Sequence, residues 1–344
     1  MKKKALLIIC SLLIVFAFKT VTEPLFVVPT KWPKPAYDFN MNPLSADKVE
    51  LGRALFYDPI LSEDSSVSCA SCHSQFTAFT HVDHALSHGI NDRIGNRNSP
   101  ALMNLAWQNK FMWDGAVNHL DVQALAPIRN HLEMDEKIEN VVRKLQRNNL
   151  YKRMFNTAFG DSLATGEYTL KAISQFMLTL VSSNAKYDSV MLGKAKFSEQ
   201  EKKGYALFKK NCAACHTEPL FTNASFENNG LPVDTTLNDI GRIGITHIPS
   251  DSLKFKVPTL RNIEFSQPYM HDGRFKKLQE VLKHYVFGIN KSKTLSSHLA
   301  KPIMLKPSEQ VDLISFLLTL TDKKFLFDQR YSYPKKLFSK EARD

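Results

Sequence analysis

The sequence predicts an all-α protein of two domains that begin alike. Residues 52–56 (GRALF) and 204–208 (GYALF) are two copies of one pattern, and each copy precedes a string of the form C-x-x-C-H. Between the copies, apolar residues recur at helical spacing, whereas the alternation typical of half-buried strands is scarce. A repeated helix that leads to a repeated motif indicates two related domains, and 344 residues suffice for two domains of ordinary size.

The N-terminus has the form of an export segment. Three lysines follow Met1, and an apolar run covers residues 5–18. A basic region before an apolar run of this length is typical of a secretory signal, whereas a membrane span needs roughly 20 apolar residues. No clean small-x-small cleavage site follows, so residues 1–24 are interpreted as either a signal peptide or an uncleaved N-terminal anchor. Cys10 lies inside the run and is interpreted as one more apolar residue.

The first domain is predicted over residues 25–196. One helix is expected to carry residues 52–56 toward the first motif. A second is indicated by apolar residues at helical spacing, and the members of that pattern are Ile138, Val141, Val142 and Leu145. Residues 170–181 predict a strongly apolar helix.

The second domain is predicted over residues 197–330. Ser198 and Glu201 form a capping box that opens its first helix. Residues 222–252, rich in Asn, Gly, Thr and Asp, predict a long loop. A last helix is expected from Pro307 to Leu320, because proline is favoured in the first turn. Residues 331–344 are expected to form a basic tail.

The two C-x-x-C-H strings indicate covalently bound haem. They are Cys69, Cys72 and His73 in the first domain, and Cys212, Cys215 and His216 in the second. This spacing is the attachment signal for haem c: the thiols form thioethers, and the histidine is the proximal iron ligand. The alternative is one tetrahedral zinc site made by the four cysteines. It leaves no role for a histidine after both pairs, so two covalently bound haem c groups are expected.

The formal net charge of +11 has two interpretations. Part of it belongs to the export segment and part to the tail, so it can simply serve solubility. It can also steer the protein toward an acidic redox partner or an anionic membrane surface. Nucleic acid is not expected as a partner of a secreted haem protein.

Two further stretches carry a family resemblance. Residues 97–135 contain RNSPALMNLAWQNKFMWDGAVNHLDVQALAPIRNHLEMD, and residues 255–275 read FKVPTLRNIEFSQPYMHDGRF. With both haem motifs in order, the chain resembles the bacterial di-haem cytochrome c peroxidase family. That family includes the methylamine-utilisation di-haem enzyme that matures a tryptophan-derived quinone cofactor. The resemblance implies two c-type cytochrome domains, with peroxide at the N-terminal haem and electron transfer at the C-terminal haem.

The resemblance also implies roles for three side chains. Glu133 matches the distal glutamate that moves protons during peroxide cleavage, and Gln123 matches the glutamine of the same pocket. Trp113 matches the tryptophan between the two haems. Taken without the family, Glu133 is an ordinary surface carboxylate and Trp113 a core aromatic residue. The chain departs from many relatives at Ala116, where an arginine often follows the W-D-G sequence.

Further ligands are implied around both irons. Asn98, Ser266 and Pro268 match positions that hold a calcium ion in these peroxidases, an ion that prefers oxygen ligands. In many members a loop histidine blocks the peroxide iron at rest. The corresponding loop contains His81, His84 and His88, of which His88 is the candidate gate.

The sixth ligand of the second iron is expected to be Tyr285. Peroxidases that accept electrons from small cytochromes usually have methionine there, which raises the potential. Counted from His271, that position falls on Tyr285, and the quinone-maturing relative also has tyrosine. A phenolate stabilises ferric iron and lowers the potential. Met270 and His284 are neighbours that stay open as alternatives.

We therefore expect an exported, periplasmic di-haem peroxidase. It would reduce hydrogen peroxide to water with electrons from a small cytochrome c or a similar donor. One alternative is a protein-modifying oxidase of the tryptophylquinone-maturing type, argued from Tyr285. Another is a non-catalytic di-haem electron carrier, which would have no need of Glu133 and Gln123 in a pocket. Relatives are often homodimers, and an uncleaved N-terminus would tether the protein to the inner membrane.

Overall fold

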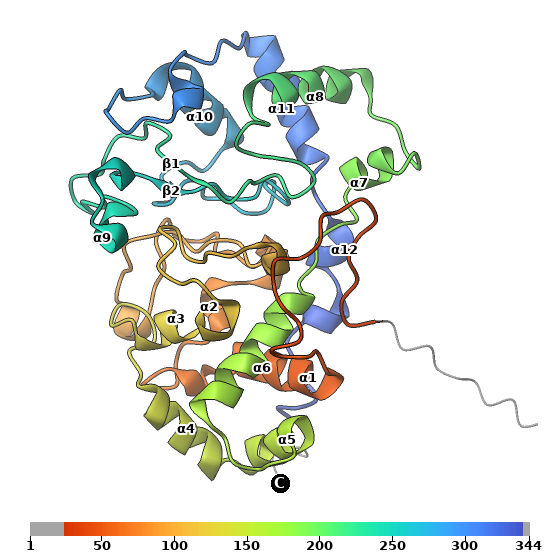
Figure 1. Cartoon of the computed structure of the whole chain (residues 1–344), viewed down its shortest axis with the longest axis vertical. Coiled ribbons are helices and arrows are strands. Elements are labelled where there is room, and N and C mark those ends of the chain that lie inside the picture. The colour runs from red at the N-terminus through yellow and green to blue at the C-terminus, as the bar shows by residue number, and fades with distance from the viewer. Residues whose placement is uncertain (1–23, 340–344) are drawn as a thin grey trace, which may run out of the picture.

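The computed structural model describes residues 24–339. The predicted export segment, with Cys10, and the last five residues lie outside the described residues. Two groups of helices are stacked one above the other (Figure 1), with the first motif in the lower group and the second in the upper group. No helix within residues 24–339 is long and apolar enough to cross a membrane.

The described chain is mainly helical, and the prediction of an all-α fold is confirmed. The lower group contains α1 (Ala46–Tyr57), α2 (Cys69–Cys72), α3 (Leu125–Arg129), α4 (Ile138–Arg147), α5 (Asn149–Phe159) and α6 (Gly166–Thr179). The rest of the chain contains α7 (Lys186–Met191), α8 (Glu199–Asn211), α9 (Ile243–Thr246), α10 (Leu278–Lys283), α11 (Pro307–Leu318) and α12 (Lys323–Leu326). Two short strands, β1 (Phe226–Glu227) and β2 (Phe255–Lys256), pair antiparallel with Phe226 opposite Lys256.

Each group is built on one close helix crossing. In the lower group α1 crosses α6 at Gly52, where a Cβ atom would overlap the carbonyl oxygen of Ala172. In the upper group α8 crosses α11 at Gly204, where a Cβ would overlap the carbonyl oxygen of Asp312. Glycine is required at both positions because the two backbones approach so closely. The sequence repeat therefore encodes a repeated helix crossing.

Two hydrophobic clusters surround these crossings. The first cluster includes Phe56 and Phe176, whose ring centroids are 5.2 Å apart. The second cluster includes Phe208 and Phe316, at 5.1 Å. The phenylalanine of each repeat therefore occupies an equivalent place in its own core. We call the elements around these clusters the first half and the second half.

The ends of several predicted elements are confirmed or adjusted. The Ser198 hydroxyl accepts from the backbone N–H of Glu201, and the Glu201 carboxylate accepts from that of Ser198, as the predicted capping box requires. The helix that begins at Pro307 ends at Leu318, and α12 follows it, so it is not the last helix. The predicted loop over residues 222–252 contains β1 and α9 as short elements.

The clusters depart from the expected division of the chain in two places. Tyr187 of α7 packs in the second cluster, although it precedes residue 197. Phe325, Leu326 and Tyr331 return to the first cluster, and Tyr331 donates a hydrogen bond to the carbonyl of Thr179. These apolar side chains are buried in the cluster of the half to which the expected boundaries do not assign them. The start of the expected basic tail is therefore anchored by a buried side chain.

Ion pairs connect the two halves where the motifs face each other. Arg97 pairs with Asp114 of the first half and with Asp239 of the second, both at 2.6 Å. Arg242 donates from the second half to the carbonyl of Asp114 at 2.8 Å. Both partner carboxylates are nearly buried, so these contacts fix how the halves meet.

Candidate functional site

The first motif forms a single helical turn. Cys69 and Cys72 are the first and last residues of α2, so their thiols project from one side of that turn. The ring Nδ1 of His73 donates to the carbonyl of Phe79 at 2.8 Å. A carbonyl can only accept, so the proton is on Nδ1, and Nε2 is available as an iron ligand. Loss of hydration lowers the pKa of His73 to about 4, which keeps the ring neutral.

The second motif repeats this arrangement at the end of α8. The Nδ1 of His216 lies 3.2 Å from the carbonyl of Phe221 and 3.1 Å from that of Pro258. Loss of hydration lowers the pKa of His216 to about 4 as well. Both histidines are thus neutral and oriented through a backbone carbonyl, which is how iron-bound histidines are commonly held.

The donor set fits two haems and does not fit zinc. None of the four motif cysteines forms a disulfide with another cysteine of the described residues. Cys69 packs against the first cluster and Cys212 against the second. Within residues 24–339, no three His, Cys, Asp or Glu side chains converge as a metal site. The four-cysteine alternative is therefore wrong, since its ligands lie on different cores.

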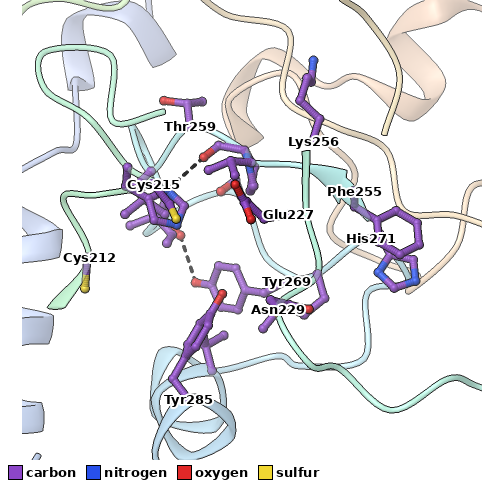
Figure 2. A pocket seen from close by; sticks show the side chains of 18 of the residues that line it. Cys212, Cys215, Glu227, Asn229, Phe255, Lys256, Thr259, Tyr269, His271 and Tyr285 are labelled. Carbon is purple, nitrogen blue, oxygen red and sulfur yellow. Dashed lines mark hydrogen bonds between the residues drawn. The ribbon is translucent and has the colours of Figure 1, made fainter. Parts of the chain in front are cut away.

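A mainly apolar pocket of about 250 Å³ adjoins the second motif. Cys212, Cys215 and His216 form part of its lining, and Tyr285 enters it from the turn after α10 (Figure 2). Burial raises the pKa of the Tyr285 hydroxyl, and a hydrogen bond with Asn229 opposes that shift. Tyr285 thus faces the space in which a haem attached to this motif must lie.

The two alternatives to Tyr285 are placed differently. Met270 also lines the pocket, and its Sδ accepts from the side-chain amide of Asn229 at 3.6 Å. His284 is absent from the described lining, and its Nε2 lies 3.1 Å from the carbonyl of Asn229. The geometry favours Tyr285 or Met270 over His284.

Trp113 lies at the junction of the halves. Its indole N–H donates to the carbonyl of Asn98 at 2.8 Å, and its own carbonyl accepts from the backbone N–H of Lys256 at 2.7 Å. The indole meets the ring of His271 edge-on at 6.5 Å. Trp113 also lines the pocket of the second motif. A first-half side chain thus reaches into the second site.

The three candidate calcium residues lie along one pocket. Asn98, Ser266 and Pro268 all contribute to the lining that contains Trp113. The backbone N–H of Asn98 donates to the carbonyl of His271 at 2.7 Å, so Asn98 joins the two halves. Its own carbonyl is engaged by the Trp113 indole.

Glu133 lies beside the first motif. Its carboxylate accepts from the Asn130 side-chain amide at 2.7 Å. Burial raises its pKa, and that hydrogen bond opposes the rise. The Glu133 charge raises the pKa of both Cys69 and Cys72, although burial of each thiol is the larger cause. This carboxyl next to the haem-attachment turn therefore keeps its proton to higher pH than an exposed glutamate does.

Gln123 precedes α3, whereas Glu133 follows it. The Gln123 side-chain amide donates to the Sδ of Met112 at 3.6 Å. In the described part of the chain, no hydrogen bond connects Gln123 to Glu133. The structure therefore places Gln123 beside the residue that precedes Trp113.

His88 is turned toward an exposed carboxylate. Its Nδ1 lies 2.7 Å from Asp92, whose side chain is 86% exposed. Its ring stacks on His84 at 4.1 Å, and His84 stacks on His81 at 5.2 Å. The next residue, Gly89, packs so closely on the backbone of Glu133 that a Cβ there would overlap it. The loop lies against the first site, and the His88 ring, 25% exposed, is held between His84 and Asp92.

Sequence reasoning missed two residues of this junction. Lys256 donates to Gln108 at 2.6 Å, and loss of hydration lowers its pKa to about 8. Figure 2 shows Lys256 extending away from Tyr285. His271 stacks on Phe255 at 3.7 Å. Both lie within residues 255–275, so the resemblance located the segment, but no pattern in the sequence revealed that these half-buried side chains lie where the two halves meet.

Comparisons with known proteins agree with this geometry. A family model described as di-haem cytochrome c peroxidase matches residues 46–196, and one described as cytochrome c matches residues 201–321. The chain is 38% identical over 291 residues to methylamine utilization protein MauG of Methylorubrum extorquens, covering 81% of this chain and 79% of that protein. It is 35% identical over 251 residues to cytochrome c551 peroxidase of Nitrosomonas europaea, covering 71% and 74%.

A solved structure supports the same conclusion. A MauG-like protein associated with microbial copper homeostasis superposes with a TM-score of 0.81 at 30% identity, covering 90% of this chain and 98% of that one. Fold and motifs together define a protein with two c-type haem sites. The chain belongs to the di-haem cytochrome c peroxidase family, which includes the MauG-like proteins, and its cofactors are two covalently bound haem c groups.

Proposed function

We propose that the protein reduces hydrogen peroxide to water in the periplasm, with electrons from a small cytochrome c or a similar carrier. Each turnover consumes one peroxide, two electrons and two protons and yields two water molecules. The His73 haem, when bound, supplies an iron atom with an open position for peroxide. Glu133 takes a proton from the incoming peroxide and returns it to the departing oxygen. Gln123, whose side-chain amide donates to Met112 in this structure, is proposed to assist Glu133 when the haem is bound.

The position of Glu133 is the observation that carries this proposal. A carboxyl beside the attachment turn, with its pKa raised by burial, exchanges protons more readily near neutral pH than an exposed glutamate does. An inert electron carrier would have no use for such a group next to its haem.

Electrons are proposed to enter at the His216 haem and to reach the His73 haem through Trp113. This route is supported by two observations. Trp113 lines the pocket next to the second motif, and its indole N–H donates a hydrogen bond to the carbonyl of Asn98. We further propose that Asn98, Ser266 and Pro268 hold a calcium ion that stiffens this junction.

A second candidate function is oxidation of a protein substrate by the same two haems. Tyr285 favours it, because a phenolate ligand lowers the potential of the second haem and makes electron uptake from a high-potential cytochrome harder. Such a haem would instead share oxidising equivalents with Trp113. The similarity to methylamine utilization protein MauG supports keeping this candidate.

The deciding experiment is steady-state oxidation of reduced cytochrome c by hydrogen peroxide, using the haem-loaded protein. Glu133→Gln is expected to keep both haems and to lose about a hundredfold or more of the turnover. Glu139→Gln, an exposed carboxyl on α4, is the matched control and should leave turnover unchanged.

Equal turnover in Glu133→Gln and the wild type would contradict the role of Glu133. No turnover in the wild type, with peroxide still shifting the haem spectrum, would favour the protein-modifying candidate.

A further inference from the structure

One segment forms both a wall of the second pocket and an end of the molecule. Residues 281–308 supply pocket-lining side chains, among them Tyr285, Leu299 and Ile303. Figure 1 shows α10 and the chain that leads from it to α11 at the end of the molecule remote from α4 and α5. The inner side of this segment faces the space next to His216.

The exposed charged side chains of this segment are all of one sign. Residues 281–308 include no Asp or Glu and five lysines, which are Lys283, Lys291, Lys293, Lys301 and Lys306. All five side chains are exposed. None of them has a carboxylate within ion-pair distance among the residues that the structure describes, in contrast to Lys186, Lys202 and Lys209 of α7 and α8. Glu280 and Glu309 border the segment, but the five ammonium groups within it have no ion-pair partner among the described residues and give it a net positive potential.

Two large exposed apolar side chains belong to the same segment. Phe287 is 78% exposed and follows Tyr285 by two residues, and Met304 is 79% exposed and follows Ile303 directly. Aromatic residues and methionine are enriched in protein interfaces, whereas charges belong to the rim. We call the five lysines together with Phe287 and Met304 the basic surface.

We propose that the basic surface docks an acidic redox protein that delivers electrons to the His216 haem; this rests on the proposed peroxidase function. The partner releases one electron in each encounter, so two encounters supply the two electrons that reduce one peroxide with two protons. Lysines steer the acidic partner toward this end of the molecule, and Phe287 and Met304 provide the apolar contact after encounter. The partner then rests on the outer wall of the pocket, where the path to the haem is short.

The place of this surface favours a redox partner over an anionic membrane. A membrane contact needs only charge and apolar side chains, and these could lie on any face. Here they coincide with the segment that lines the haem pocket, which is the place where an electron donor gains most from binding.

The test compares two charge-reversed variants of the haem-loaded protein. Lys291→Glu/Lys293→Glu/Lys301→Glu alters the basic surface, and Lys152→Glu/Lys194→Glu/Lys196→Glu alters exposed lysines elsewhere. Both change the net charge equally. The donors are a reduced acidic bacterial cytochrome c, a reduced lysine-rich mitochondrial cytochrome c and a small-molecule reductant.

We expect kcat/KM with the acidic donor to fall about tenfold or more in the first variant. The second variant should stay close to the wild type, and turnover with the small reductant should be the same in all three proteins. Added salt should lower kcat/KM with the acidic donor for the wild type. The first variant should show little dependence on salt. Equal kcat/KM values for the two variants with the acidic donor would overturn the proposal.

Binding measured by calorimetry separates this proposal from the function it rests on. If no donor supports turnover, the peroxidase function fails, but the affinity for the acidic cytochrome still tests the docking. Weaker binding in the first variant alone would support the basic surface, and equal binding in both variants would overturn it. Loss of binding to phosphatidylglycerol vesicles in the first variant, with unchanged binding of the acidic cytochrome, would overturn it in favour of a membrane.

Discussion

At the residue scale, the chemistry of Glu133 depends on two opposing influences. Burial favours its neutral form, whereas the amide of Asn130 donates to its carboxylate and favours the charged form. A proton acceptor must be ionised before peroxide arrives. Activity should therefore be lost as pH falls through the pKa of Glu133, and this loss should occur at higher pH than for an exposed glutamate.

This balance predicts the effect of Asn130→Ala. Removing the amide takes away a hydrogen bond to a charged group, worth about 1.5–3 kcal/mol. Since 1.36 kcal/mol corresponds to one pKa unit, the acid limb of the kcat/KM profile should move up by about one to two pH units.

Asn140→Ala is the matched control, because Asn140 donates to Glu136 at 2.8 Å in the same way but further from the motif. An acid limb that moves equally in both variants, or in neither, would argue against Asn130 as a positioning residue.

Tyr285 allows a second prediction at the residue scale. If its oxygen is the sixth ligand of the His216 haem, Tyr285→Phe should abolish the low-spin ferric spectrum of that haem and leave the spectrum of the first haem unchanged. Tyr269→Phe is the control, since Tyr269 lines the same pocket but donates its hydroxyl to the carbonyl of Ile263 at 2.9 Å. An unaltered spectrum in Tyr285→Phe would leave Met270 as the candidate in the pocket.

At the scale of elements, the same crossing device appears twice. Gly52 lets α1 lie on α6, and Gly204 lets α8 lie on α11, and the phenylalanine four residues later packs in the core in both cases. Helix–turn–motif units of this form bring the cysteines to the edge of a core, so the thiols face a haem while the helices remain packed.

The close crossing of α8 and α11 predicts that two Gly→Ala substitutions change the free energy of unfolding in opposite directions. In a helix interior, Gly→Ala ordinarily stabilises by about 0.5–1 kcal/mol. At Gly204 the new Cβ would overlap the backbone of Asp312, which no side-chain rotation can relieve, so Gly204→Ala should destabilise by about 3 kcal/mol. Gly244→Ala in α9 meets open space and should be neutral or stabilising. Chemical unfolding of both variants checks this, and equal midpoints would contradict the crossing.

At the scale of the whole molecule, the sequence predicted the individual helices and motifs better than it predicted how they pack together. Local sequence patterns predicted the all-α class, both haem motifs, the Ser198 capping box and the start of α8. The structure keeps each of these local features. The return of Phe325, Leu326 and Tyr331 to the first cluster does not, because an apolar residue carries no information about which core it joins. Likewise, nothing in the sequence marks Arg97 as the partner of Asp239 across the halves.

For the candidate site, too, the sequence predicted the positions of residues along the chain but not the directions of their side chains. The motif residues and the segments of Trp113 and Tyr285 could be located from spacing and resemblance. The orientation of His88 toward Asp92, and of Gln123 toward Met112, depends on loop packing. These rings and amides rotate about side-chain bonds, so sequence position alone does not decide whether they face a pocket or solvent.

The junction itself carries the last prediction. Trp113 is held from both halves, through the carbonyl of Asn98 and the backbone N–H of Lys256, and its ring lies edge-on to His271. If electrons pass through its indole, Trp113→Phe should slow the reoxidation of the second haem after peroxide is added to the fully reduced protein. The first haem should react at its usual rate, because its own site is intact. Stopped-flow spectroscopy resolves the two haems by their spectra.

Trp107→Phe is the control for this prediction. Trp107 is a buried tryptophan whose indole N–H donates to the carbonyl of Pro33 at 2.8 Å, so it shares the size and bonding of Trp113. It packs in the first cluster and does not line the pocket next to the second motif. Slower reoxidation of the second haem in Trp113→Phe alone would assign electron passage to the junction. Equal slowing in both variants would instead mean that losing an indole loosens the fold.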